Sequence, residues 1–181
     1  DIGLGAVTLF DGADTYGNGR SEEQLAKAFA GARREVVYAT KFGYDFYTPQ
    51  AAEKRRGQSE LPHDFSPAFV RKALEGSLRR LQTDYVDIYQ MHNARMTQIE
   101  DDALWELLES FKREGKVRMY GVALGPAIGW LYEAVDAVKK RNAASLQIIW
   151  NALEQYPGNE QIRAAHDIGA DTGYMIRVPH Y

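Results

Sequence analysis

Short apolar runs alternate with helical segments along most of this chain. The runs are rich in Val, Ile, Tyr and Leu, and their apolar residues do not alternate cleanly with polar ones. Strands that are buried on both faces have this composition. The pattern predicts six strands, at residues 6–11, 35–41, 85–91, 117–123, 144–150 and 173–178.

Between these runs, apolar residues recur at helical spacing behind recognisable start signals. Ser21, with Gln24 three residues later, predicts a capping box at the first helix. Ser66 followed by Pro67 predicts the start of a second helix, and Asp101 suits the positive end of a third. Two more helices are predicted near 127–141 and 159–169.

Strand–helix alternation at this spacing predicts an α/β fold with a parallel sheet. The sheet is either open and doubly wound or part of a closed (β/α)8 barrel. No glycine-rich dinucleotide fingerprint follows the first strand. Polar groups follow at least three strands, which favours a TIM-type barrel. Six strands fall short of eight, so we expect residues 1–181 to be a single barrel domain that is truncated at both ends.

Composition excludes several classes of function. The net charge of −3 gives no electrostatic reason to expect nucleic acid or an anionic membrane as a partner. No run approaches the ~18 apolar residues of a membrane span. Cysteine is absent, which excludes disulfides and thiolate metal sites and is compatible with the reducing cytosol. The four histidines lack metal-ligand spacing. We therefore expect a cytoplasmic protein without a metal site, and the sequence indicates no oligomeric state.

Four residues of complementary chemistry follow the apolar runs. Asp11, Lys41 and His92 come at the ends of the first three predicted strands, and Tyr16 lies in the loop after the first. Because the carboxyl ends of parallel strands share one rim, these side chains are expected to meet there. An acid, a phenol, an amine and an imidazole at one place predict a proton-transfer site.

The chemistry of such a site follows from its charges. An ammonium near a phenol favours the phenolate, so Lys41 is expected to lower the pKa of Tyr16. Asp11 fixes Lys41 and keeps it charged, while His92 hydrogen-bonds a substrate oxygen. The natural reaction is reduction of a carbonyl. The long loop at 42–65 carries aromatic residues that either line a substrate pocket or pack on one another.

The sequence around these residues resembles the signatures of the aldo-keto reductase family. Leu9–Gly17 is similar to the opening of that family's active site, and Thr40–Gly43 to its lysine strand. Ser77–Tyr89, which leads into His92, resembles its second signature. Gly115–Arg118 and the following Gly121-Val122 look like the approach to its fifth strand. The resemblance extends over nearly the whole chain.

The resemblance implies a (β/α)8 barrel that uses NADPH or NADH and reduces an aldehyde or ketone to an alcohol. It implies that Tyr16 is the general acid, that Asp11 and Lys41 tune it, and that His92 orients the substrate carbonyl. Gln147 matches the family's glutamine for the nicotinamide carboxamide, although a polar side chain in a barrel interior explains it equally well.

The chain departs from the family pattern at two positions. Ala123–Pro126 replaces the usual Ser-Asn that holds the carboxamide. Arg177 occupies the place of an aromatic residue that stacks on the nicotinamide, and its guanidinium plane could stack instead or form an ion pair. By comparison with the family, the segments that bind the pyrophosphate and the adenosine phosphate would follow residue 181. No residue here discriminates NADPH from NADH.

Two other functions remain open. Lys41 could be the Schiff-base nucleophile of a lyase, although that role needs a neutral amine and Asp11 favours the charged form. A nicotinamide-binding barrel could also act as a sensor or partner subunit without catalysis. If the chain ends at Tyr181, we expect poor cofactor affinity and no activity.

Overall fold

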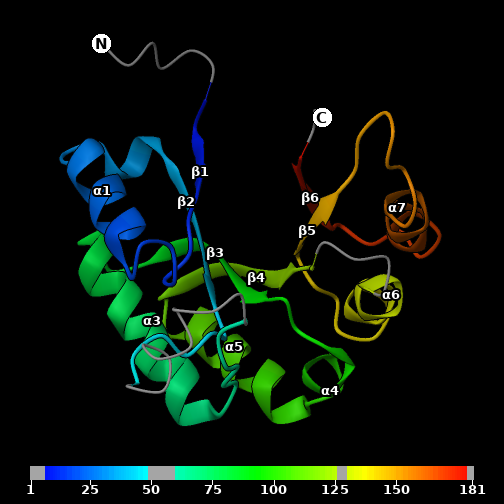
Figure 1. Ribbon diagram of the computed structural model, residues 1–181, viewed down its shortest axis with the longest axis horizontal. Coiled ribbons are helices and arrows are strands. Elements are labelled where there is room, and N and C mark those ends of the chain that lie inside the picture. Colours follow the sequence, from blue (N-terminus) through cyan, green and yellow to red (C-terminus); the bar gives the residue numbers. More distant parts are fainter. Residues whose placement is uncertain (1–6, 49–59, 126–129, 179–181) are drawn as a thin grey trace.

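Six parallel strands form one curved, open sheet in the computed structural model, which describes residues 7–48, 60–125 and 130–178 (Figure 1). The strands pair in sequence order, from β1 at one edge to β6 at the other. Their bounds are β1 Leu9–Asp11, β2 Val37–Phe42, β3 Val86–His92, β4 Val117–Ala123, β5 Ser145–Ile149 and β6 Gly173–Arg177. The predicted α/β fold and all six predicted strands are confirmed, with ends that differ by up to three residues among those described.

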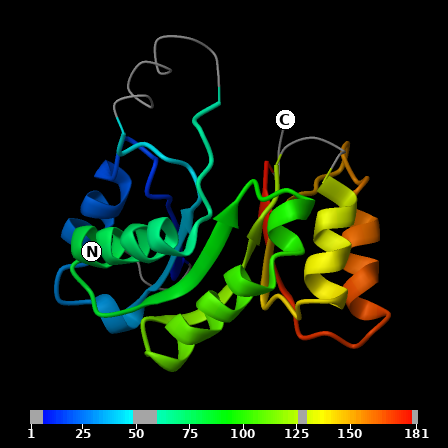
Figure 2. The same ribbon diagram turned by 90° about the horizontal axis from the view of Figure 1, so that it is seen from below.

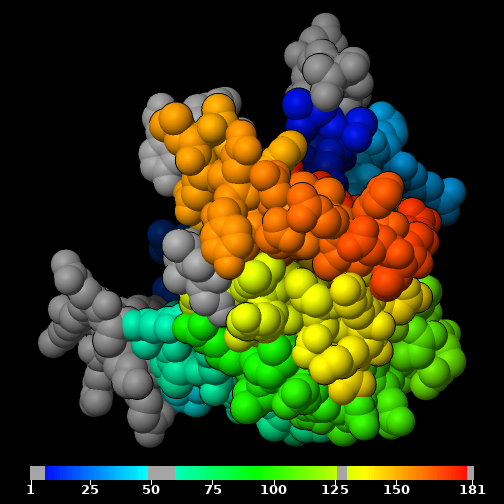
Figure 3. Space-filling model, turned by 90° about the vertical axis from the view of Figure 1, so that its right-hand side faces the viewer, coloured from blue at the N-terminus to red at the C-terminus, as the bar shows by residue number. Residues whose placement is uncertain are grey.

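Helices follow the strands and cover the outer, convex face of the sheet (Figure 2). The longer ones are α1 Arg20–Ala28, α3 Pro67–Leu81, α5 Asp102–Arg113, α6 Leu131–Lys139 and α7 Gly158–His166. Figure 3 shows α6 and α7 side by side on one face of the molecule. A short 3-10 helix η1 Arg33–Glu35 and a short helix α4 Met96–Ile99 were not predicted. The arrangement is a half-barrel.

The hydrophobic core lies between the convex face and these helices. Phe42 of β2 and Tyr89 of β3 stack with ring centroids 4.4 Å apart, and both are fully buried. Leu74 of α3 and Leu108 of α5 belong to the same buried cluster. The side chains on the opposite face of these strands, among them Lys41, therefore point to the concave side, where the predicted site lies.

Two of the three predicted helix starts are confirmed, and one is wrong. The Ser66 hydroxyl accepts from the Phe69 amide at the start of α3, and Asp101 caps α5, as predicted. The predicted Ser21 cap is wrong, because α1 begins at Arg20 and Ser21 lies inside the helix. Gly19 occupies the cap position with φ 92°, a conformation that glycine adopts without steric cost.

The sheet has one very close contact between neighbouring strands. Gly121 of β4 pairs with Ser145 of β5, and a Cβ atom at Gly121 would lie 1.9 Å from the Ser145 carbonyl oxygen. Only glycine fits there. In the part of the chain that the structure describes, no helix is long and apolar enough to cross a membrane.

Candidate active site

The carboxyl ends of the strands bring the predicted residues to one rim. Asp11 is the last residue of β1, Lys41 lies one residue before the end of β2, and His92 ends β3. The loop between β1 and α1 returns to this rim, where the Tyr16 ring lies 5.9 Å from the His92 ring, edge to face. The structure therefore brings all four candidates together.

Asp11 and Lys41 form a tight ion pair. The Lys41 Nζ atom lies 2.7 Å from each carboxylate oxygen of Asp11 and 2.8 Å from the carbonyl oxygen of Gly12. An ammonium has three N–H donors, so these acceptors occupy all of them. The Lys41 side chain is only 1% exposed, whereas that of Asp11 is 29% exposed. The pair thus has a fixed geometry, with its carboxylate facing the open side.

Burial changes the expected electrostatics of the lysine. It lowers the pKa of Lys41, and the charge and hydrogen bonds of Asp11 oppose that shift without cancelling it. Arg177 adds to the lowering. Asp11 was expected to keep Lys41 charged, and it does favour the charged form, but desolvation of the ammonium is the larger effect on this pKa.

The pKa of Tyr16 also moves opposite to the expectation. Partial burial and the charge of Asp11 raise this pKa, while Arg177 lowers it. The Lys41 Nζ atom lies 5.2 Å from the centroid of the Tyr16 ring, and its donors are directed at Asp11 and Gly12. Lys41 thus donates no hydrogen bond to the phenol, and the raised pKa leaves Tyr16 protonated at neutral pH.

His92 is neutral over the physiological pH range. Burial, together with the positive charges of Lys41 and Arg177, lowers its pKa to about 3, with a further contribution from His63. Its Nδ1 atom is buried and has no hydrogen-bond partner among the described residues. A neutral imidazole can donate one hydrogen bond and accept one, as a group that orients a substrate carbonyl requires.

Gln147 and Arg177 reach the same rim from β5 and β6. The Gln147 Nε2 atom donates to Asp11 Oδ2 at 2.8 Å, across the concave side of the sheet. Arg177 donates from Nη2 to the Leu124 carbonyl oxygen at 2.7 Å. Its Nε atom is buried without a partner among the described residues. Sequence reasoning missed the contact between Gln147 and Asp11.

The aromatic residues after β2 that the structure describes make two kinds of contact. Tyr44 faces the site, because its ring centroid lies 4.8 Å from that of His92, whereas Phe46 packs on the neighbouring Tyr47 at 4.0 Å. Asn93, which sequence reasoning also missed, donates to the Tyr44 hydroxyl at 2.7 Å. Residues 49–59 of this predicted loop lie outside the described residues.

A second buried charge cluster lies beneath the rim and was missed as well. Glu22 accepts from the Thr40 hydroxyl at 2.6 Å and from the Arg80 Nε atom at 2.6 Å. Asp14 is fully buried nearby, and neither of its carboxyl oxygens has a partner among the described residues. Burial and the charge of Glu22 raise the pKa of Asp14 well above its ordinary value. Asp14 therefore keeps its proton up to a higher pH than an exposed carboxyl does.

Among the described residues, those at the end of β4 and directly after it, up to Gly125, offer no polar side chain to the site. Ala123 and Leu124 are buried, and the Leu124 amide donates to the Gln147 carbonyl oxygen. Pro126 lies outside the described residues. Residues 123 and 124 thus have no polar side chain that could replace the family's Ser-Asn contact, as expected.

Comparisons with known proteins identify the family of this chain. Residues 5–173 match the Aldo/keto reductase family. The chain is 31% identical over 152 residues to the uncharacterized oxidoreductase YqkF of Bacillus subtilis, covering 83% of this chain and 45% of that protein. It is 35% identical over 119 residues to the aldo-keto reductase yakc [NADP(+)] of Schizosaccharomyces pombe, covering 64% of this chain and 32% of that protein.

The fold comparison gives the same result. The holo form of the aldo-keto reductase AKR11C1 from Bacillus halodurans superposes with a TM-score of 0.75 at 28% identity, covering 97% of this chain and 53% of that one. The chain thus spans about half the length of this neighbour and of YqkF, and less of yakc. From its match over residues 5–173, the chain belongs to the aldo/keto reductase family.

Proposed function

We propose that this chain carries the active site of an NADP(H)-dependent oxidoreductase that reduces an aldehyde or ketone to an alcohol. The observation that supports this most directly is the rim itself. There a protonated phenol, a buried Lys41 ammonium paired with Asp11 and a neutral imidazole lie together at the carboxyl ends of β1, β2 and β3.

Each residue has a part in this reaction. His92 hydrogen-bonds the substrate carbonyl oxygen and orients it beside Tyr16. When bound, the nicotinamide supplies the hydride that reaches the carbonyl carbon. Tyr16 gives its phenolic proton to the oxygen that becomes negative. The field of the Lys41 ammonium stabilises the phenolate that remains, and Asp11 holds that ammonium in place.

The residues present fit a nicotinamide at this rim. Gln147 uses Nε2 for Asp11, which leaves its amide oxygen as an acceptor for a carboxamide N–H. The buried Nε atom of Arg177, which has no partner in the part of the chain that the structure describes, marks a further polar position near this rim. We propose that Gln147 and Arg177 hold the nicotinamide. The name of the S. pombe relative favours NADPH over NADH as the cofactor.

The test is NADPH consumption with a panel of aldehydes by the whole protein that contains this chain. We expect Tyr16→Phe to lower kcat by about 10²-fold or more, because the proton donor is lost. Tyr132→Phe is the matched control, since Tyr132 is 71% exposed on α6, and it should retain full activity. Equal turnover by the wild type and Tyr16→Phe would rule out Tyr16 as the acid.

The lowered pKa of Lys41 keeps the lyase alternative open, because a neutral amine is what a Schiff base needs. The three acceptors around Nζ argue against it. Borohydride with a carbonyl substrate should leave Lys41 unmodified, and mass added at Lys41 would support the lyase. Binding of NADPH without turnover in any variant would support a sensor.

We further propose that residues 1–181 form part of a single barrel domain and that the protein acts in the cytosol. The continuous six-strand sheet and its shared core support the first statement. The absence of cysteine is compatible with the second. Limited proteolysis of the whole protein tests the first, because a single domain gives no stable fragment from cuts inside the sheet.

A further inference from the structure

The Tyr44 ring packs against one side of the His92 imidazole. The two ring centroids lie 4.8 Å apart with the planes at 79°, an edge-to-face contact. The Tyr44 ring also packs 4.2 Å from the His63 ring, and Tyr44 and His63 form an isolated antiparallel bridge. The Tyr44 ring therefore contacts two imidazoles, and its backbone bridge and its packing hold it in place.

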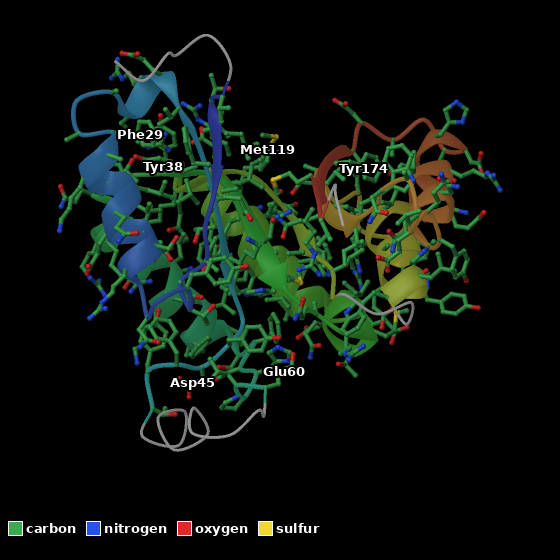
Figure 4. The ribbon with its side chains drawn as sticks, turned by 45° about the horizontal axis from the view of Figure 1, so that its top comes forward. Phe29, Tyr38, Asp45, Glu60, Met119 and Tyr174 are labelled. Carbon is green, nitrogen blue, oxygen red and sulfur yellow. The ribbon has the colours of Figure 1, made fainter. Side chains whose placement is uncertain are left out.

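The hydroxyl of Tyr44 is fixed as well. The Asn93 Nδ2 atom donates to the Tyr44 oxygen at 2.7 Å, and the Tyr44 hydroxyl donates to the Glu60 carboxylate. Figure 4 shows Glu60 among ring side chains at the lower end of the sheet. Asn93 directly follows His92 and has φ 53°, a conformation that asparagine tolerates better than most residues. The turn after β3 thus aims the Asn93 amide at Tyr44.

We propose that Tyr44 is a positioning residue for His92, whose ring, anchored by Asn93 and Glu60, keeps the imidazole dry and turned toward the substrate carbonyl. The role in catalysis rests on the proposed carbonyl reduction. The contact itself involves only side chains of this chain and does not depend on that reaction.

The groups around His92 show how contact with Tyr44 affects the pKa of the imidazole. Besides burial, the pKa of the imidazole is lowered by three positively charged groups, Lys41 of β2, Arg177 of β6 and His63 of the loop before α3. The Tyr16 ring also lies edge to face with the His92 ring. Burial is the largest cause of its lowered pKa, ahead of these charges. Because Tyr44 covers the ring, removing Tyr44 admits water and weakens that cause, while Lys41 and Arg177 keep acting.

The experiment is a pH titration of histidine ring signals by NMR in the whole protein without substrate. In the wild type we expect His92 to titrate near pH 3. In Tyr44→Leu the midpoint should rise by about one pH unit or more toward the ordinary 6.5, and the ring-current shift from the Tyr44 ring should disappear. Tyr132→Leu, at an exposed site on α6, should change neither signal.

Tyr44→Phe separates the ring from its anchors. It keeps the aromatic ring but frees the Asn93 amide and Glu60, so the His92 midpoint should rise by less than in Tyr44→Leu. A folded Tyr44→Leu protein with His92 still titrating near 3 would overturn the proposal. If Tyr44→Leu does not fold, an unchanged His92 midpoint in Tyr44→Phe overturns it. The titration needs no turnover, so its result is independent of the reductase assay.

Discussion

Replacing Gly121 by alanine should separate β4 from β5. The added Cβ would lie 1.9 Å from the Ser145 carbonyl oxygen and 2.5 Å from its hydroxyl oxygen. A carbonyl belongs to the backbone, so no change of rotamer relieves the overlap. The Ser145 backbone must move by about 1.1 Å even to reach the 3.0 Å below which such contacts are essentially never seen.

The cost follows from the neighbouring hydrogen bonds. The Ala144 amide donates to the Tyr120 carbonyl oxygen at 3.1 Å, and the Leu124 amide to the Gln147 carbonyl oxygen at 3.0 Å. A shift of that size stretches both beyond hydrogen-bonding distance, at about 1 kcal/mol each. With about 1–3 kcal/mol for overpacking, we expect Gly121→Ala to lose about 3–5 kcal/mol of unfolding free energy. The midpoint of thermal unfolding should fall by roughly 6–20 °C.

Denaturant and thermal unfolding measure this loss, and Gly173→Ala is the control. Gly173 of β6 also pairs with Ser145, but its added Cβ would lie 3.7 Å from the nearest atom, an ordinary contact. That variant should stay within about 1 kcal/mol of the wild type. Equal unfolding midpoints for the two variants would refute the close approach of β4 and β5.

Two further predictions concern buried carboxyl groups. Asp14→Asn should become more stable relative to the wild type as pH rises, because the folded chain keeps the Asp14 proton at a pH where the unfolded chain has released it. The difference should begin near the ordinary pKa of 3.8, grow to the raised pKa of the folded chain and then stay constant, as denaturation at several pH values can show. Asp87→Ala should cost about 3 kcal/mol in the same assay, because Asp87 is 2% exposed and accepts from Arg33, Arg118 and the Tyr38 amide.

Arg118, an ion-pair partner of Asp87, provides the control for the second of these predictions. Arg118→Ala should cost far less than Asp87→Ala, since the Arg118 side chain is 61% exposed and its charge is solvated. A cost as large as that of Asp87→Ala would contradict the argument. For Asp14→Asn, a stability difference that does not vary between pH 4 and 8 would show that Asp14 titrates normally.

Most of the fold could be predicted from the sequence, because the signals that mark its strands and helices are local. The fully buried strand Val86–His92 reads as an uninterrupted strand, and Ser66-Pro67 marks the start of α3 without reference to anything distant. Helix α4 was missed because four residues provide too little periodicity to detect. The Ser21 cap was wrong because Gly19 already turns the chain into the helix.

The site was predictable only as far as strand ends define it. Asp11, Lys41 and His92 each lie at or next to a strand end, so their meeting follows from a parallel sheet. The bond from Gln147 to Asp11 depends on how far the sheet curves, since 136 residues separate the two in sequence. The pKa of Tyr16 depends on burial, which a list of nearby charges does not contain.

The burial of Asp14 could not be predicted from the local sequence either. It lies in a polar stretch, Asp11–Glu23, that reads as a solvated turn followed by the start of a helix. Its burial comes from tertiary packing, and Arg80, the ion-pair partner of Glu22, lies 58 residues from Glu22 in the sequence. Tertiary packing, rather than local pattern, decides the protonation of this carboxyl.

The enclosure of the Lys41 amine has a practical consequence for chemical labelling. Acylating reagents attack a free, accessible amine, whereas this one is covered and fully engaged by oxygens in the native state. Lys72, which is exposed on α3, should react at once, while Lys41 should react only when the β1–β2 edge opens. The rate of Lys41 modification, followed by mass spectrometry, would thus report local unfolding of the candidate site.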